Sequence, residues 1–220
     1  MKLNNKRTIL VGLAFLSICA FWQMYDSIVP LILTKTFHMN ETFSGAIMAA
    51  DNILALFLLP FFGSVSDKSH SKLGKRMPFI LFGTGCAIIL MNILPLLDNS
   101  YAAQPSGFKT ASFVIVLGLL LVAMGTYRAP AVALMPDVTP KPLRSRANAI
   151  INLMGAVGGI LYLGVAAVLY PNSKTAGLDH VNYQPLFIVV SAIMFVAVAV
   201  LFLTIREPKL TAENQALEKQ

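Results

Sequence analysis

Six long apolar runs, almost free of charge, constrain the fold of this chain more than any other feature. They cover residues 9–33, 43–64, 78–97, 111–135, 147–170 and 185–205. Each run reaches the roughly 20 residues that an α-helix needs to cross the hydrocarbon of a bilayer. Of the 220 residues, 56% are hydrophobic and only 12% are charged, whereas about 25% of the residues of a soluble domain are charged. The sequence therefore predicts an all-α integral membrane protein with six spanning helices.

The first run begins like a secretory signal, because Lys2, Lys6 and Arg7 precede it. However, the run continues to Leu33, which is too long for the apolar core of a signal peptide. We therefore expect it to form the first spanning helix.

Basic residues are distributed unevenly between the two sides of the predicted bundle. If the N-terminus is cytoplasmic, thirteen of the seventeen lysines and arginines lie in cytoplasmic segments and three lie in external loops. The cytoplasmic thirteen are Lys2, Lys6, Arg7, Lys68, Lys72, Lys75, Arg76, Lys141, Arg144, Arg146, Arg206, Lys209 and Lys219. By the positive-inside rule, this asymmetry predicts a cell-membrane protein with both termini in the cytoplasm. Contact with anionic lipid headgroups then accounts for the net charge of +7 without a nucleic-acid partner.

Only Asp26, Asp51 and Arg128 are ionisable residues well inside the predicted spans. A charge at such depth costs a few kcal/mol or more unless it faces protein or water. Asp26 and Asp51 lie about 7 Å and about 4 Å outward of their helix midpoints at 1.5 Å per residue. Two neighbouring acids in a low dielectric do not both ionise easily, so one of them is a candidate proton carrier. The alternative is that these charges only form bonds that hold the helices together.

Arg128 lies about 15 Å below Asp26 along the membrane normal, so we do not expect a direct ion pair between them. Both residues stand seventeen positions after the start of their runs, and a proline follows each one closely, Pro30 or Pro130. Such a correspondence suggests two three-helix units of opposite topology with a substrate site at their interface.

Polar and aromatic residues surround these charges. Trp22, the only tryptophan, is expected near the bilayer centre rather than in the interfacial belt. It shares a helical face with Asp26. An indole, amides and a carboxylate together suit a polyol that needs stacking and hydrogen bonds, although Trp22 packed between helices is an alternative. The candidate substrate-binding residues are Trp22, Gln23, Tyr25, Asp26, Arg128 and Asn152.

Glycines follow Asn152 on the fifth run at positions 155, 158 and 159. Small residues let the backbones of neighbouring membrane helices approach closely. We therefore expect these three glycines to have a packing function.

The loop after the second run carries a distinctive motif. Residues 63–80, GSVSDKSHSKLGKRMPFI, resemble the loop 2–3 signature of the major facilitator superfamily. The form of the motif is similar to that of the sucrose-transporter-like and glycoside–pentoside–hexuronide cation symporter branch. Residues 51–63 and 127–156 fit the same group. The resemblance covers all six runs and implies the N-terminal half, a 3+3 inverted repeat, of a twelve-helix sugar transporter that works by alternating access.

The resemblance also implies functions for the charged loops. Asp67 would bond the N-terminus of a helix in the other half, where free N–H groups stabilise a carboxylate. Gly63 would permit close approach, and Lys75 and Arg76 would anchor the loop to headgroups and nearby acids. The expected gating residues are Gly63, Asp67, Gly74, Lys75, Arg76, Asp137, Arg144 and Arg146. The alternative is that these loop charges only set the topology.

The coupling ion is expected to be a proton. Melibiose-type relatives carry Asp-x-x-x-Asp-Pro in their second helix as a sodium site, but Ala55 and Leu59 precede Pro60 here. Proton coupling through Asp26 or Asp51 is therefore favoured over sodium coupling, and no other cofactor or metal is expected.

The chain has six runs where the family has twelve helices. We expect residues 1–206 to form the six-helix bundle and residues 207–220 to begin a central cytoplasmic linker. A C-terminal bundle would join it in cis in a longer protein or in trans as a partner. The first, second, fourth and fifth helices would face that bundle, and the third and sixth would face lipid.

Other classes of membrane protein fit the sequence less well. Haem ligation needs histidines within helices, but His38, His70 and His180 fall in loops, and the metalloprotease and serine-hydrolase motifs do not occur. An enzyme is therefore not expected. The alternatives to a transporter half for a disaccharide or glycoside are a non-transporting subunit, a sugar sensor or a truncated, inactive fragment.

Overall fold

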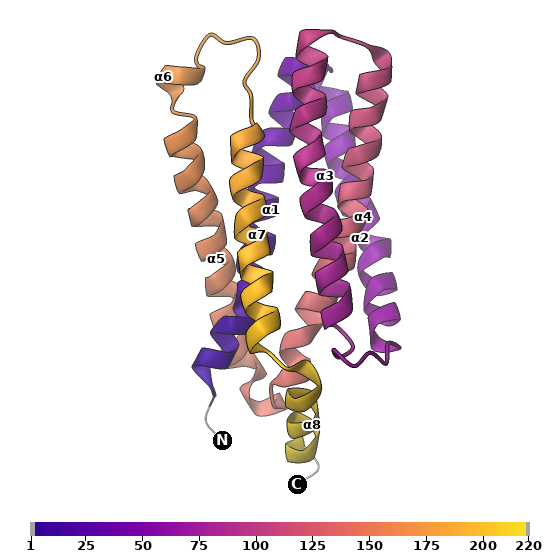
Figure 1. The fold of residues 1–220 in the computed structure, drawn as a ribbon, viewed down its shortest axis with the longest axis vertical. Coiled ribbons are helices and arrows are strands. Elements are labelled where there is room, and N and C mark those ends of the chain that lie inside the picture. The colour runs from indigo at the N-terminus through magenta and orange to yellow at the C-terminus, as the bar shows by residue number, and fades with distance from the viewer. Residues whose placement is uncertain (1–2, 219–220) are drawn as a thin grey trace.

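The computed structural model describes residues 3–218, and its long elements are helices that run along one common axis (Figure 1). Six are long and apolar enough to cross a membrane, which confirms the six spans of the predicted all-α fold. They are α1 (Asn5–Leu31) with its π-helical continuation η1 (Ile32–Thr36), α2 (Glu41–Asp67), α3 (Met77–Ala103), α4 (Gly107–Val138), α5 (Arg144–Leu169) and α7 (Gln184–Thr204). The shorter elements are η2 (Lys141–Leu143), α6 (Asn172–Thr175) and α8 (Glu207–Glu218).

Several helices extend past the predicted runs because polar residues can continue a helix beyond the hydrocarbon. The clearest case is α3, which continues from the predicted end at residue 97 to Ala103 and so includes Asp98. Prolines inside the helices, such as Pro30 and Pro130, do not end them. Membrane helices tolerate proline because neighbouring groups satisfy the freed backbone carbonyls.

The arrangement of the helices has an internal two-fold relation. Helix α1 packs against α5 and α7, helix α4 packs against α2 and α3, and α3 packs against α7. Exchanging α1 with α4, α2 with α5 and α3 with α7 leaves this set of contacts unchanged. The packing therefore agrees with the predicted 3+3 inverted repeat.

Glycines bring the closest helix pairs together. A Cβ atom at Gly158 would overlap the carbonyl oxygen of Leu16, and one at Gly155 would lie 2.9 Å from Sγ of Cys19, so α5 contacts α1 directly. A Cβ atom at Gly83 would lie 2.7 Å from the backbone nitrogen of Tyr127, which brings α3 onto α4. The packing function predicted for the glycines of α5 is confirmed at these two positions.

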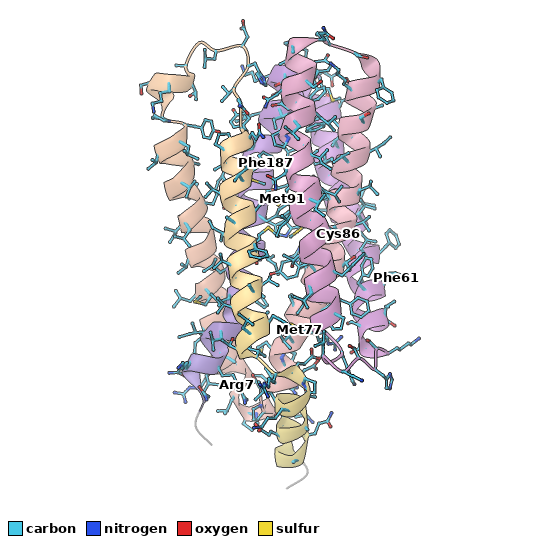
Figure 2. All side chains as sticks on the ribbon, viewed as in Figure 1. Arg7, Phe61, Met77, Cys86, Met91 and Phe187 are labelled. Atoms are coloured by element: carbon cyan, nitrogen blue, oxygen red, sulfur yellow. The ribbon has the colours of Figure 1, made fainter. Side chains whose placement is uncertain are left out.

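The core lies between α1, α3, α4 and α7. Met91 and Phe187 are fully buried at the contact between α3 and α7, whereas Phe61 of α2 points outward (Figure 2). Polar contacts join α1 and α4, because the hydroxyl groups of Ser17 and Tyr127 lie 2.6 Å apart and the Tyr127 hydroxyl lies 3.1 Å from the carbonyl oxygen of Ala14. Helix α2 is the most exposed span, since none of its large apolar residues is buried.

We expect Gly158→Ala to destabilise the bundle, because the new methyl group overlaps the backbone of α1. Overpacking of this kind typically costs about 1–3 kcal/mol, which should lower the thermal midpoint of the purified protein in detergent. Gly164→Ala on the same helix is the control, because a Cβ atom there has no neighbour within 4 Å among the described residues. Equal midpoints for the two variants would contradict the close contact.

Candidate functional site

A small cavity within the bundle brings together residues from three helices. Trp22 of α1, Asp51 of α2 and Arg128 of α4 line it, together with apolar side chains that include Leu58 and Leu121. Cζ of Arg128 lies 5.5 Å from the centroid of the Trp22 ring, within the range of a cation–π interaction. The structure thus places three of the predicted intramembrane residues around one space.

Trp22 and Tyr25 present hydrogen-bonding groups near this cavity. The half-buried ring of Trp22 contacts Phe21 and Tyr25 edge to face, with centroids 5.2 Å and 5.3 Å apart. Nε1 of Trp22 and the hydroxyl of Tyr25 are buried and make no hydrogen bond to a described residue. Buried polar groups are normally satisfied, so these two unbonded groups are exceptions that lie beside the cavity.

The remaining predicted substrate residues lie on an open face of the bundle rather than in the cavity. Gln23, Asp26 and Asn152 are all exposed. Gln23 approaches α5, because its Oε1 lies 3.8 Å from the place where Gly159 would carry a Cβ atom. These three polar side chains therefore lie on exposed surfaces of α1 and α5.

The two intramembrane acids are close enough for their charges to interact. Asp51 accepts hydrogen bonds from the backbone and side-chain nitrogens of Asn52, at 2.6 Å and 2.8 Å. Among the described residues, neither Asp26 nor Asp51 forms an ion pair with Arg128. The expectation that Asp26 and Arg128 are not bridged directly agrees with this geometry.

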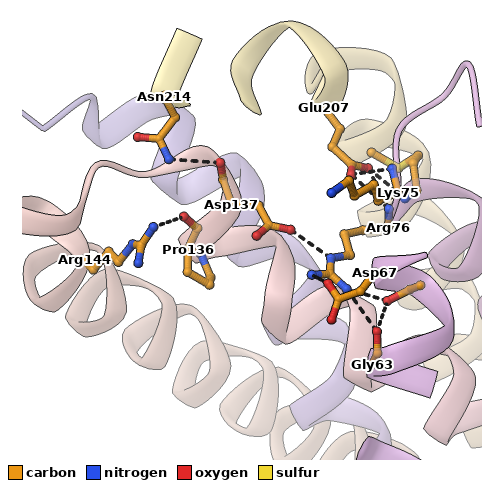
Figure 3. A network of polar contacts seen from close by, with 11 residues as sticks. Gly63, Asp67, Lys75, Arg76, Pro136, Asp137, Arg144, Glu207 and Asn214 are labelled. Atoms are coloured by element: carbon orange, nitrogen blue, oxygen red, sulfur yellow. Dashed lines mark hydrogen bonds and ion pairs between the residues drawn. The ribbon is translucent and has the colours of Figure 1, made fainter. Parts of the chain in front are cut away.

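At the end of the bundle that holds both termini, called the charged end below, Arg76 joins three helices (Figure 3). Only 5% of this residue is exposed. Its guanidinium group pairs with Asp67 at the end of α2, and its Nε donates to Oδ2 of Asp137 on α4 at 2.8 Å. It also donates to Ser66 and to the carbonyl oxygen of Gly63.

Burial by itself would lower the pKa of the Arg76 guanidinium group. The hydrogen bond and charge of Asp137, together with the charge of Asp67, outweigh burial and hold this pKa above its ordinary value. The group therefore stays charged, and its two carboxylate partners neutralise it.

Glu207 of α8 contacts the loop that carries Arg76. Its carboxylate accepts hydrogen bonds from the backbone N–H groups of Lys75, Arg76 and Met77 at 2.7 to 2.9 Å. These are free N–H groups at the start of α3, which a carboxylate satisfies well. Gly74 has a φ of +111°, and a Cβ atom there would overlap the Glu207 carboxylate. Glycine is therefore required for this contact.

Expected gating residues from two separate segments of the chain meet in one network. Asp137, at the end of α4, bonds to Arg76 of the loop after α2. Arg144 instead donates to the carbonyl oxygens of Thr139 and Pro136, at 3.1 Å and 2.9 Å. Arg146 is exposed on the first turn of α5.

The structure also places the other expected gating residues, whose part in gating stays a prediction. Arg76 contacts acids as expected, but burial keeps it from headgroups, whereas the side chain of Lys75 is exposed. A Cβ atom at Gly63 would have no neighbour within 4 Å among the described residues. No described residue therefore makes the close approach expected at Gly63. The side chain of Asp67 is 61% exposed, so it remains accessible from outside.

Sequence reasoning missed the contribution of residues 207–218. This segment, predicted to begin a linker, forms α8 and packs against the end of α4, where Nδ2 of Asn214 donates to the carbonyl oxygens of Asp137 and Thr139. No periodic signal marked Glu207 as a capping residue. The one sequence signal for this contact is that Glu207 is an acid that closely follows a spanning helix. The division into a bundle and a linker stays a prediction.

Comparison with known proteins gives consistent similarities. Residues 11–220 match the family model described as Major Facilitator Superfamily. The chain is 35% identical over 158 residues to the sucrose transport protein SUC3 of Arabidopsis thaliana, and the alignment covers 66% of this chain and 26% of that protein. It is 36% identical over 154 residues to the sucrose transport protein SUT3 of Oryza sativa subsp. indica, covering 64% of this chain and 30% of that protein.

A more distant relative is the human solute carrier family 45 member 3, which is 25% identical over 186 residues, or 83% of this chain and 34% of that protein. The chain thus spans about a quarter to a third of the length of these curated relatives. The family match covers nearly all of the chain, and the six spans, their pseudo-symmetric packing and the loop motif agree with it. The chain therefore belongs to the major facilitator superfamily, and its six spanning helices correspond to the N-terminal half of that fold.

Proposed function

We propose that this chain forms the N-terminal half of a secondary transporter that carries a sugar, most simply a disaccharide or glycoside, by alternating access. The observation that carries the proposal is the convergence of Trp22, Asp51 and Arg128, from α1, α2 and α4, on one small space inside the bundle. The sequence similarity to proteins named as sucrose transporters supports the substrate class. No catalytic chemistry is required of these residues.

The cavity offers the types of contact that a sugar needs. The guanidinium group of Arg128 has planar, forked donors for sugar hydroxyl oxygens. Nε1 of Trp22 and the hydroxyl of Tyr25, which lack partners among the described residues, can bond further hydroxyl groups. Gln23, Asp26 and Asn152 on the adjoining open face then supply the polar surface that completes the site together with a second half.

Asp26 and Asp51 are the proposed proton carriers. Their charges interact, and neither is neutralised by Arg128 among the described residues. An acid in that position gains a proton more readily than an ion-paired one. The apolar residues before Pro60 make sodium the less favoured coupling ion.

The Arg76 network is the proposed gate element. The protein would lie in the cell membrane, with the charged end facing the cytoplasm. Arg76 connects the ends of α2, α3 and α4, so these ends would move as one unit. The exposed carboxylate of Asp67 would bond a helix N-terminus of the C-terminal half when the transporter faces outward.

We expect Arg128→Lys to abolish sugar accumulation, because an ammonium group cannot reproduce the forked donors or the stacking on Trp22. Uptake of labelled disaccharide would be measured in proteoliposomes that contain the chain alone or together with a co-expressed C-terminal half. Arg206→Lys, which changes an exposed arginine at the charged end, should leave uptake unchanged. Full accumulation by the Arg128 variant would leave this residue with a packing function alone.

Replacing the proton-carrying acid by asparagine should separate coupling from transport. We expect Asp26→Asn or Asp51→Asn to lose accumulation driven by a pH gradient while retaining sugar exchange, because exchange requires no net proton movement. Asp179→Asn, in an exposed loop, serves as the control. If both single variants keep pH-driven accumulation, the two acids take no part in coupling.

The open face should be the surface that meets the second half. In a variant without native cysteines, a thiol at Gln23 on α1 should crosslink to a co-expressed C-terminal half, or to a second copy, because burying polar groups away from lipid favours association. A thiol at Ile89, exposed on α3, should crosslink poorly. The reverse pattern would show that the bundle associates through a different face.

A further inference from the structure

A buried acid lies at the end of the bundle opposite the charged end, far from the proposed transport cavity. Asp98, near the C-terminal end of α3, is 0% exposed. Neither of its carboxylate oxygens makes a hydrogen bond of good geometry to a described residue. Its neighbours are the Thr36 hydroxyl and the imidazole of His180. A buried carboxylate without bonds is unstable as an anion unless a positive charge lies beside it.

His180 connects three parts of the chain at this point. Its Nδ1 lies 4.0 Å from Oδ2 of Asp98 and 3.2 Å from Oγ1 of Thr36 in η1. Its Nε2 lies 2.9 Å from Oδ1 of Asn99 on α3. The side chain is 27% exposed, so protons from the solvent can reach it. The imidazole therefore attaches the segment 171–183, which links α5 to α7, to the ends of α1 and α3.

The surrounding bonds determine which imidazole nitrogen titrates. Nδ2 of Asn99 donates to Oδ1 of Asn182 at 2.9 Å, so Oδ1 of Asn99 is the acceptor for His180 and Nε2 carries a hydrogen. Nδ1 is then the atom that gains or loses a proton, and it faces both Asp98 and Thr36. The Thr36 hydroxyl can donate to a neutral Nδ1 or accept from a protonated one.

Few other titratable groups act on this pair. Among the described residues, Tyr183, just before α7, is a further titratable group close to Asp98. Burial first, and then the charge of Asp98, raises the pKa of Tyr183, so it stays neutral. Lys109 of α4 instead donates to the carbonyl oxygens of Ser100 and Gln104 at 2.8 Å. The charge balance around Asp98 therefore depends on His180.

We infer that Asp98 and His180 together form a proton-binding site that holds residues 171–183 against α3 as long as the pair retains one proton. With that proton on either residue, the pair is neutral overall, either as two neutral groups or as an ion pair. When the proton leaves, a negative charge remains buried at Asp98. Opening of the segment then becomes favourable because it lets water reach the carboxylate.

The direction of the pH response follows from this balance. The closed form binds one proton more than the open form, so the contact of residues 171–183 with α3 is stable at low pH and loosens as pH rises. With the termini in the cytoplasm, as proposed above, the site faces the external solution. It would then sense external pH independently of the acids proposed for coupling.

Hydrogen exchange of the wild-type chain in lipid nanodiscs tests the inference. Backbone amides of residues 178–184 would be followed between pH 5 and 8, with exchange corrected for its intrinsic pH dependence. We expect the opening equilibrium to rise by up to roughly tenfold per pH unit where the pair loses its proton. Protection that does not change with pH in the wild-type chain would overturn the inference.

Two variants and a control identify the titrating pair. Asp98→Asn should remain closed across the range, because its side chain cannot become an anion. His180→Gln should shift the loss of protection to lower pH, because only Asp98 can then hold the proton. Asp179→Asn, an exposed acid beside His180, should respond like the wild type. A wild-type pH response in both Asp98→Asn and His180→Gln would show that other groups cause it.

Discussion

Hydrocarbon offers no hydrogen bond to a polar group, and this constraint governs where every polar atom of the bundle lies. It requires each spanning segment to be a helix, since only a helix satisfies its own backbone within the membrane. Some polar side chains at depth bond to one another, as Ser17 and Tyr127 do, and others are exposed on the surface of α1, as Gln23 and Asp26 are. The other polar groups concentrate at the two ends of the bundle.

The two ends solve the problem of buried charge differently. At the charged end, Arg76 has two carboxylate partners, so the guanidinium group remains charged and couples α2, α3 and α4. Removal of one partner from such a buried pair leaves an uncompensated charge, which makes the geometry stringent. At the opposite end, the imidazole of His180 is the basic group beside Asp98 among the described residues. The proposed pH response belongs to that pair.

Between these ends, the central cavity is held by rigid elements. Direct backbone contacts at Gly158 and Gly83 fix α5 on α1 and α3 on α4. The contact between the hydroxyl groups of Ser17 and Tyr127 joins α1, which carries Trp22, to α4, which carries Arg128. Helix α2 lies on α4 with little burial of its own. Asp51 is therefore carried by the least buried wall of the cavity.

The sequence by itself determined the number and approximate position of the spans, because hydrophobic length is a local property of the chain. It also identified the intramembrane charges, because a charge in hydrocarbon has a high free-energy cost and therefore stands out in an apolar run. The loop motif was found by its resemblance to the family signature. Only the tertiary structure decided that Asp137 bonds Arg76 rather than Arg144, that Glu207 caps α3 and that Asp98 is buried beside His180. The two residues of each of these pairs are 61 to 132 positions apart along the chain. Helix packing, which no local pattern encodes, brings them to the same depth.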